Sequence, residues 1–223
     1  MSAGRIALLL ATKDLRLEAR GRHAANLLLP FAAATLVVFG LTLGPGRQLL
    51  QTTAPALLWV TTLFAALLGA RNAFELEDED GALTGLLLAP ADKGAVFLGK
   101  MLALALMLAA LQTAAGVIAL LLFGLELAGP AAGVLAAFVL GSLGLAAVGA
   151  LFSALVVSAK AREALLPVLV LPVTIPVALA GIRVTALGLG GGAGVGSWLA
   201  ILAAFDAVFV AAGFLLFVWV LED

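Results

Sequence analysis

The residues that could do chemistry in this chain gather mostly in one polar segment. Residues 71–100 read RNAFELEDEDGALTGLLLAPADKGAVFLGK, in which five acids come directly before a glycine and a short apolar stretch. Acids ahead of a helix complement its positive N-terminal end, and the spacing of Leu83, Leu86 and Leu87 places them on one helix face. A proline then ends the helix. The segment therefore predicts a short amphipathic helix with an acidic collar.

Such a helix, set between two long apolar stretches, has no structural need for exposed leucines. It therefore predicts a docking site for a partner protein. A helix that only lies on the membrane surface is the alternative interpretation. The residues expected to form the docking site are Glu77, Asp78, Asp80, Gly81, Leu83, Leu86, Leu87 and Pro90.

Little else in the composition offers catalytic chemistry. The chain has no Cys, which excludes disulfides, thiolate metal sites and thiol nucleophiles. Its one histidine, His23, is expected to be an interfacial side chain rather than a haem ligand. Residues 94–101 nearly match a phosphate-binding loop, but Met101 lacks the hydroxyl that ligates Mg²⁺, so Lys100 is expected to be an interfacial anchor. The sequence predicts a non-catalytic protein with no directly bound metal or cofactor.

One acid, Asp206, lies deep in an apolar stretch. A charged side chain at the centre of a membrane-spanning helix costs about 3 kcal/mol. Asp206 is therefore expected either to be protonated or to bond a Ser or Thr of a neighbouring helix. A proton or cation site is the alternative, although no other ionisable residue lies at a similar depth to form a relay.

Three prolines interrupt another apolar stretch at close spacing: Pro167, Pro172 and Pro176. Each removes a backbone donor and clashes with the preceding turn. Because freed carbonyls in a membrane must face protein or water, this helix is expected to be kinked and to lie inside the bundle, with Thr174 bonding a freed carbonyl. A conformational hinge and a static kink are equally compatible with the pattern.

The elements that must position these residues are membrane-spanning helices. The chain is 64% hydrophobic and 11% charged, against roughly half and a quarter in soluble domains. Because a span needs about 20 apolar residues, the sequence predicts an all-α, polytopic integral membrane protein of one domain, residues 1–223. Its six predicted spans are residues 24–43, 55–70, 95–123, 131–157, 164–186 and 198–221.

The distribution of Lys and Arg predicts the orientation. With the N-terminus inside, ten of the twelve cations lie on the inner side and only Arg47 and Arg183 on the outer side. This asymmetry places both termini in the cytoplasm and the chain in the cytoplasmic, or inner, membrane. Residues 4–22 are expected to form a helix in the membrane interface, with a plain basic anchor as the alternative. Residues 71–94 form the cytoplasmic loop that carries the docking helix.

Assembled in this way, the chain resembles the permease subunit of an ABC-2-type ATP-driven transporter, and more narrowly the cytochrome c maturation protein B family, called haem exporter B. Four segments carry the resemblance, from the N-terminal region to the fifth span. They are Lys13-Asp14-Leu15-Arg16-Leu17-Glu18-Ala19-Arg20; Pro55-Ala-Leu-Leu-Trp59-Val60; residues 78–90 with Gly99-Lys100; and Leu169-Val-Leu-Pro172-Val-Thr-Ile-Pro176.

The resemblance implies a complex in which two copies of a separate ATPase subunit bind and hydrolyse ATP. It also implies a haem-handling membrane subunit and a haem chaperone as partners, with haem on those partners. The implied function is haem export or release of haem-loaded chaperone. Two alternatives stay open: an ABC-2 permease for a lipid or drug, and an ion-coupled carrier that uses Asp206. The net charge of −1 gives no basic excess for nucleic-acid binding.

Overall fold

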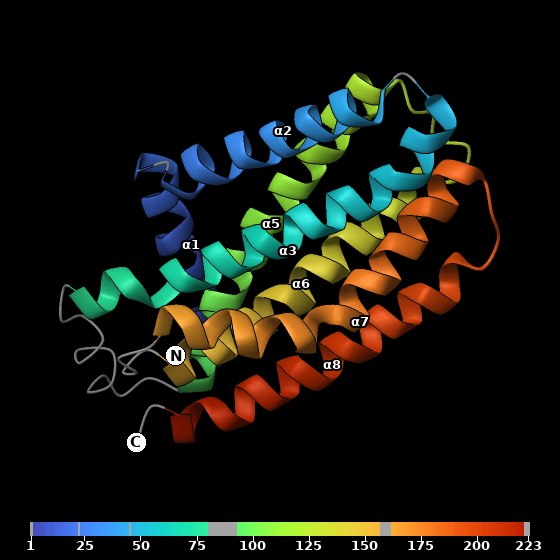
Figure 1. Ribbon diagram of the computed structural model, residues 1–223. Helices are drawn as coiled ribbons and strands as arrows, with labels where there is room; N and C mark the ends of the chain where they lie inside the picture. The colour runs from blue at the N-terminus through green and yellow to red at the C-terminus, as the bar shows by residue number, and fades with distance from the viewer. Residues whose placement is uncertain (1, 22, 45, 80–92, 157–161, 221–223) are drawn as a thin grey trace.

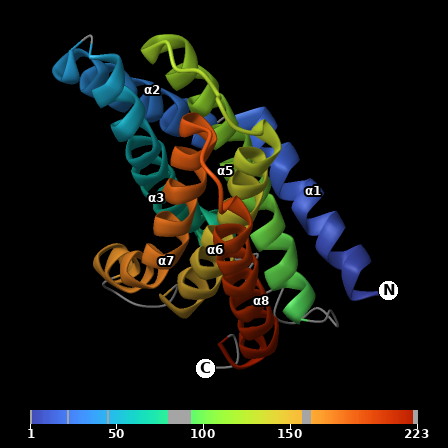
Figure 2. The ribbon, with the colours of Figure 1, turned by 90° about the vertical axis from the view of Figure 1, so that its right-hand side faces the viewer.

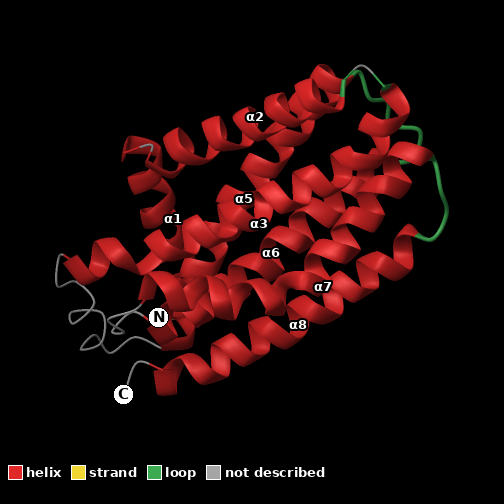
Figure 3. Ribbon diagram, viewed as in Figure 1, coloured by secondary structure: helices red, strands yellow, loops and turns green. Residues whose placement is uncertain are grey.

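The computed structural model describes residues 2–21, 23–44, 46–79, 93–156 and 162–220. These residues fold into seven α-helices, and Figure 3 shows no strand among them. The helices are α1 (Ala3–Gly21), α2 (His23–Leu43), α3 (Arg47–Glu79), α5 (Lys93–Phe123), α6 (Ala131–Val156), α7 (Arg162–Gly190) and α8 (Val195–Val220). The all-α prediction is confirmed.

Five of these helices are long and apolar enough to cross a membrane. They lie within α3, α5, α6, α7 and α8, and each overlaps a predicted span. The span of α3, Gln48–Arg71, begins before the predicted residue 55. The remaining predicted span, residues 24–43, is helical in α2, but its apolar part among the described side chains is only Leu28–Leu43. Because a span needs about 20 residues, the count of six stays a prediction.

The spanning helices form a bundle with α6 at its centre (Figure 1). Helix α6 contacts α3, α5, α7 and α8, and it is the most buried of the five spans. Its sequence is rich in Gly and Ala, which lets neighbouring backbones approach closely where lipid provides no hydrophobic driving force. The composition of this span alone predicts such close packing, and the structure confirms it.

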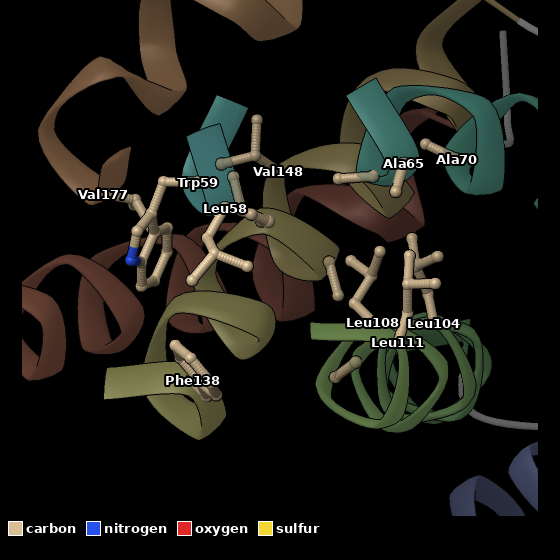
Figure 4. Close-up of a cluster of buried hydrophobic side chains, with 14 of the residues drawn as sticks. Leu58, Trp59, Ala65, Ala70, Leu104, Leu108, Leu111, Phe138, Val148 and Val177 are labelled. Atoms are coloured by element: carbon tan, nitrogen blue, oxygen red, sulfur yellow. The ribbon is translucent and has the colours of Figure 1, made fainter. Parts of the chain in front are cut away.

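Trp59 of α3 packs against both α6 and α7. Its ring is fully buried between Gly141 of α6 and Gly181 of α7, where a Cβ on either glycine would overlap the ring. Its indole Nε1 donates a hydrogen bond to Thr185 Oγ1 of α7 at 3.0 Å. Figure 4 shows the ring among Leu58, Val177 and Phe138. The Phe138 and Trp59 rings pack edge to face, with their centroids 6.3 Å apart. Only glycine fits at both contact positions.

Helix α7 continues through its three prolines, and Figure 2 shows its first turns lying at an angle to the rest. The expected kink is therefore present, since each proline removes a backbone donor. The expectation that this helix lies inside the bundle is met in part: α7 contacts α3, α6 and α8, but Pro172 and Pro176 are exposed and Pro167 is half-buried. Whether this kink moves as a hinge stays a prediction.

Thr174 is buried, on the face of α7 opposite Pro172 and Pro176. Its hydroxyl donates to the carbonyls of Val170 at 2.9 Å and Leu171 at 3.1 Å. The prolines free the carbonyls four residues before them, which are not these two. The expectation that Thr174 bonds a freed carbonyl is therefore wrong.

Candidate functional site at the polar end of the bundle

The end of α3 and the beginnings of α5 and α7 lie at one end of the bundle, with the end of α8 (Figure 1). The glycine-rich loops after α2, α5 and α7 lie at the other end. Arg71, Lys93 and Lys100 belong to the first end, whereas Arg47 and Arg183 belong to helix segments toward the loop end. The bundle therefore has one end rich in charged residues, and the predicted docking segment connects two helices there.

The structure describes only part of that segment. Helix α3 does not stop at the end of its apolar part but continues to Glu79, so Glu77 and Asp78 are helical. Residues 71–79, expected to be loop, extend α3 because Ala, Glu and Leu are good helix formers. The other predicted docking residues lie outside the described residues, and their short helix stays a prediction. They are Asp80, Gly81, Leu83, Leu86, Leu87 and Pro90.

Helix α1 packs across the beginning of α5 at this same end. Ala7 and Ala11 are buried in the contact, and a Cβ on Gly99 would lie 2.7 Å from Leu10 Cβ and 3.0 Å from the Ala7 carbonyl oxygen. Glycine is therefore required where the two backbones meet. Only one face of α1 points away from the bundle, so the expected interfacial helix is also a packed part of the fold.

A buried ion pair accompanies this contact. Lys100 Nζ lies 3.1 Å from Asp14 Oδ2, with side-chain exposures of 5% and 18%. The expectation that Lys100 is an interfacial anchor is wrong, because its ammonium points into the α1–α5 contact rather than outward. A charge this buried depends on its partner, since an unpaired one pays the full desolvation cost. Asp14 also contacts the exposed Lys13 at 3.2 Å.

Asp206 lies in the middle of α8, where that helix contacts α6. Its side chain is 5% exposed and rests on Gly144, where a Cβ would lie 2.6 Å from Asp206 Oδ1. Neither carboxyl oxygen has a hydrogen-bond partner among the described residues. Of the two expectations, a bond to a neighbouring Ser or Thr is therefore wrong within the described residues, and a protonated carboxyl stays a prediction.

Another buried polar contact, between α5 and α6, was not predicted from the sequence. Ser142 Oγ of α6 donates to Gln112 Oε1 of α5 at 3.4 Å, and both side chains are fully buried. The amide nitrogen of Gln112 has no partner within the described residues. A single Gln in an apolar helix is a weak sequence signal, although polar side chains in membrane helices often bond across helices.

The structure also allows a test of whether the spans could hold haem. Among the described residues no group of three or more His, Asp or Glu side chains could hold a free metal ion, but haem needs only one or two axial ligands. An apolar hollow of about 200 Å³ lies between α3, α5, α6 and α7, and no charged residue lines it. Its two threonines, Thr113 and Thr185, already bond the carbonyls of Ala109 and Gly181. Sites for drug-sized ligands start near 300 Å³, so this hollow is too small and too apolar for haem with its two carboxylates.

Asp206→Asn will leave the free energy of unfolding within about 1 kcal/mol of the parent, because the amide keeps the shape and cannot carry a charge. Gly144→Ala will lower it by about 1–3 kcal/mol, since the new methyl group overpacks the contact with the carboxyl. Chemical unfolding in mild detergent measures both. A loss of several kcal/mol in Asp206→Asn alone would contradict the finding that the carboxyl lacks a partner.

The comparisons with known proteins agree with this architecture. The family model described as CcmB protein matches residues 5–217. The chain is 37% identical over 177 residues to Heme exporter protein B of Pseudomonas aeruginosa, covering 78% of this chain and 77% of the relative. It is 35% identical over 186 residues to Heme exporter protein B of Paracoccus denitrificans, covering 82% and 83%. This multi-pass membrane protein therefore belongs to the CcmB family.

Proposed function

We propose that this chain is the membrane-spanning permease subunit of an ATP-driven complex for cytochrome c maturation. The match of the CcmB family model to residues 5–217 carries the proposal. Two relatives that align with most of the chain bear the name Heme exporter protein B. In this proposal a separate ATPase subunit, present in two copies, hydrolyses ATP, and the chain itself catalyses no reaction.

The proposed topology has six spans, with both termini on the cytoplasmic side of the inner membrane. The two ends of the bundle support it, because cations are concentrated at the end where α3 and α5 are connected. Helix α2 supplies the sixth span, and α1 lies in the cytoplasmic interface. The predicted docking helix, residues 81–90, lies outside the described residues, and in this proposal it contacts the ATPase.

The proposed coupling is mechanical. Helix α3 is continuous from Arg47 to Glu79, so a push on the docking segment is transmitted along it to Trp59. Trp59 passes the displacement to α6 and α7 through its contacts with Gly141 and Gly181. The kink in α7 lets the ends of that helix move separately, with Pro167, Pro172 and Pro176 as the hinge.

Release of a haem-loaded chaperone is the form of the function that we favour over passage of haem through this subunit. The chain has no Cys and no Tyr, and its one His lies near the start of α2. The apolar hollow is too small for haem. A haem-handling membrane subunit and a haem chaperone therefore carry the haem, and ATP binds to the ATPase subunit.

Leu83→Asp with Leu86→Asp will reduce ATPase co-purification by about 100-fold or more, because two carboxylates replace apolar contacts at the centre of the interface. The measurement is a pull-down of the tagged chain in mild detergent, with mass spectrometry and a haem absorbance scan. Leu127→Asp is the matched control, because Leu127 is exposed in the loop after α5 at the other end.

Each result of that pull-down has a defined meaning. An ATPase, a haem-handling membrane protein and haem together support cytochrome c maturation. An ATPase without haem partners indicates an ABC-2 permease for another cargo, such as a lipid or drug. Normal ATPase recovery by the double variant, with unchanged thermal unfolding, contradicts the docking site.

An ion-coupled carrier is the second candidate, because Asp206 is buried at mid-span without a described partner. A carrier of this kind acts without an ATPase. Ion-dependent transport by the purified chain alone in liposomes, lost in Asp206→Asn, would replace the first proposal with this one.

A further inference from the structure

The charges of α1 are sorted between its two faces. The acids Asp14 and Glu18 are half-buried on the side of the bundle, whereas Arg5, Lys13 and Arg16 are exposed. Asp14 is occupied by Lys100 and Lys13. The outward face of α1 therefore carries positive charge, with its neighbouring acids turned inward.

Large apolar side chains lie among those cations. Leu8, Leu9 and Leu17 are 63%, 59% and 52% exposed. A shallow hollow of about 350 Å³ lies on this face, where apolar and basic side chains alternate. It is lined by Leu9, Thr12, Lys13, Arg16 and Leu17. Leucines exposed in this way are costly in water, and basic residues beside them suit a surface that is both apolar and anionic.

The position of α1 brings this face to the edge of the membrane. Helix α1 lies on the outside of the bundle beside α5 (Figure 2). It meets α5 at Gly99 and Lys100, in the first turns of the apolar helix Lys93–Phe123. The outward face of α1 is therefore level with the beginning of a membrane span, where lipid headgroups lie.

We propose that the outward face of α1 binds an anionic phospholipid. The headgroup phosphate contacts Arg16 and also Lys13, one helical turn away, whose exposed ammonium keeps its contact with Asp14. An acyl chain lies against Leu9 and Leu17. The proposal rests on the cytoplasmic placement of α1 in the proposed function, because anionic lipids give that leaflet its negative surface potential. It adds that α1 selects the charge of its lipid.

An acidic surface of a partner protein is the competing occupant. It satisfies the cations, but it leaves three exposed leucines in water unless it is also apolar. A lipid satisfies both features, because long basic side chains reach the phosphate while leucines enter the acyl region. The pattern of charge and exposure on this face therefore favours lipid.

The absence of Cys gives a direct test in the full-length chain. Leu9→Cys introduces a single thiol for an environment-sensitive fluorophore, and Leu8→Cys provides a second exposed position. The labelled chain is reconstituted in vesicles that contain spin-labelled phosphatidylglycerol or spin-labelled phosphatidylcholine at equal mole fraction. Ser197→Cys, exposed at the start of α8 near the loop end, is the control position.

We expect phosphatidylglycerol to quench the label on α1 more strongly than phosphatidylcholine does, with no such preference at Ser197→Cys. Arg16→Gln will weaken that preference about fivefold, because one cation near an anionic surface contributes roughly that factor. Arg183→Gln, an exposed arginine of α7, will leave it unchanged.

Equal quenching by both lipids at Leu9→Cys and Leu8→Cys overturns the proposal. Absence of quenching by either lipid also overturns it, and indicates that a protein covers this face. The ATPase pull-down is a separate readout. If the parent chain recovers the ATPase and both lipids quench equally, only the lipid site is rejected. If the parent chain recovers no ATPase, the proposed function is rejected.

Discussion

Trp59→Ala will lower the free energy of unfolding by about 3–5 kcal/mol. The ring is fully buried and fills the space that Gly141 and Gly181 leave between α6 and α7. Its removal leaves a cavity where three helices meet, and Thr185 loses the indole donor. Because cavities in a packed bundle collapse only partly, the cost is at the upper end for a single substitution.

Two substitutions at the same position and its neighbour separate the contributions. Trp59→Phe keeps an aromatic ring but removes the indole N–H, so we expect a loss of about 1–2 kcal/mol. Val60→Ala, on the outward side of the same helix, will change stability by about 0.5 kcal/mol or less. Chemical unfolding of each purified variant in mild detergent gives the comparison.

Gly181→Ala reaches the same contact from the opposite side. The new methyl group overlaps the Trp59 ring, so stability falls by about 1–3 kcal/mol. In the double variant Gly181→Ala, Trp59→Phe part of this loss is recovered, because the smaller ring leaves room for the methyl group. Strictly additive losses would contradict the direct contact between the two residues.

The spans were predictable because the membrane leaves the backbone little choice. A run of about 20 apolar residues in lipid must satisfy its own backbone, and a helix does so within the segment. Helix α3 was the exception, since its apolar part ends at Arg71 but the helix continues to Glu79. Hydropathy indicates where the lipid-exposed part ends, whereas Ala73, Glu75 and Leu76 favour helix beyond that boundary.

The partners of the polar side chains were not predictable. The sequence around Lys100 is compatible with a side chain that extends to lipid headgroups and with one that is buried. Only the packing of α1 on α5 distinguishes these two arrangements. The proline face of α7 depends in the same way on which neighbours cover that helix. Periodicity gives the face of a helix, but it does not give the neighbour.

For Asp206, too, the sequence did not predict which residue it contacts. Its depth in the span was evident from the sequence, but its contact with Gly144 joins residues 62 positions apart on two helices. A glycine in a Gly- and Ala-rich span signals close packing without naming what packs there. The docking segment remains the part of the candidate site that rests on sequence pattern alone.

Lys100→Met will lower the free energy of unfolding by about 3 kcal/mol. Methionine keeps most of the length and apolar character of the side chain, so the change removes mainly the charge that faces Asp14. Breaking a buried pair costs about 3–5 kcal/mol because the remaining ion is uncompensated. The Asp14 side chain is 18% exposed and also contacts Lys13, so we expect a loss at the low end of that range.

The other partner of Asp14 supplies a matched control. Lys13 lies 3.2 Å from the same carboxyl but is 44% exposed, so Lys13→Met will cost less than about 1 kcal/mol. Asp14→Asn with Lys100→Met will recover most of the loss, because the carboxylate that would lack its Lys100 partner is removed as well. Equal losses of stability for Lys13→Met and Lys100→Met in chemical unfolding would show that the Lys100–Asp14 pair contributes no more than a surface contact. In that case Gly99 and the alanines of α1 hold this helix on α5 by packing alone.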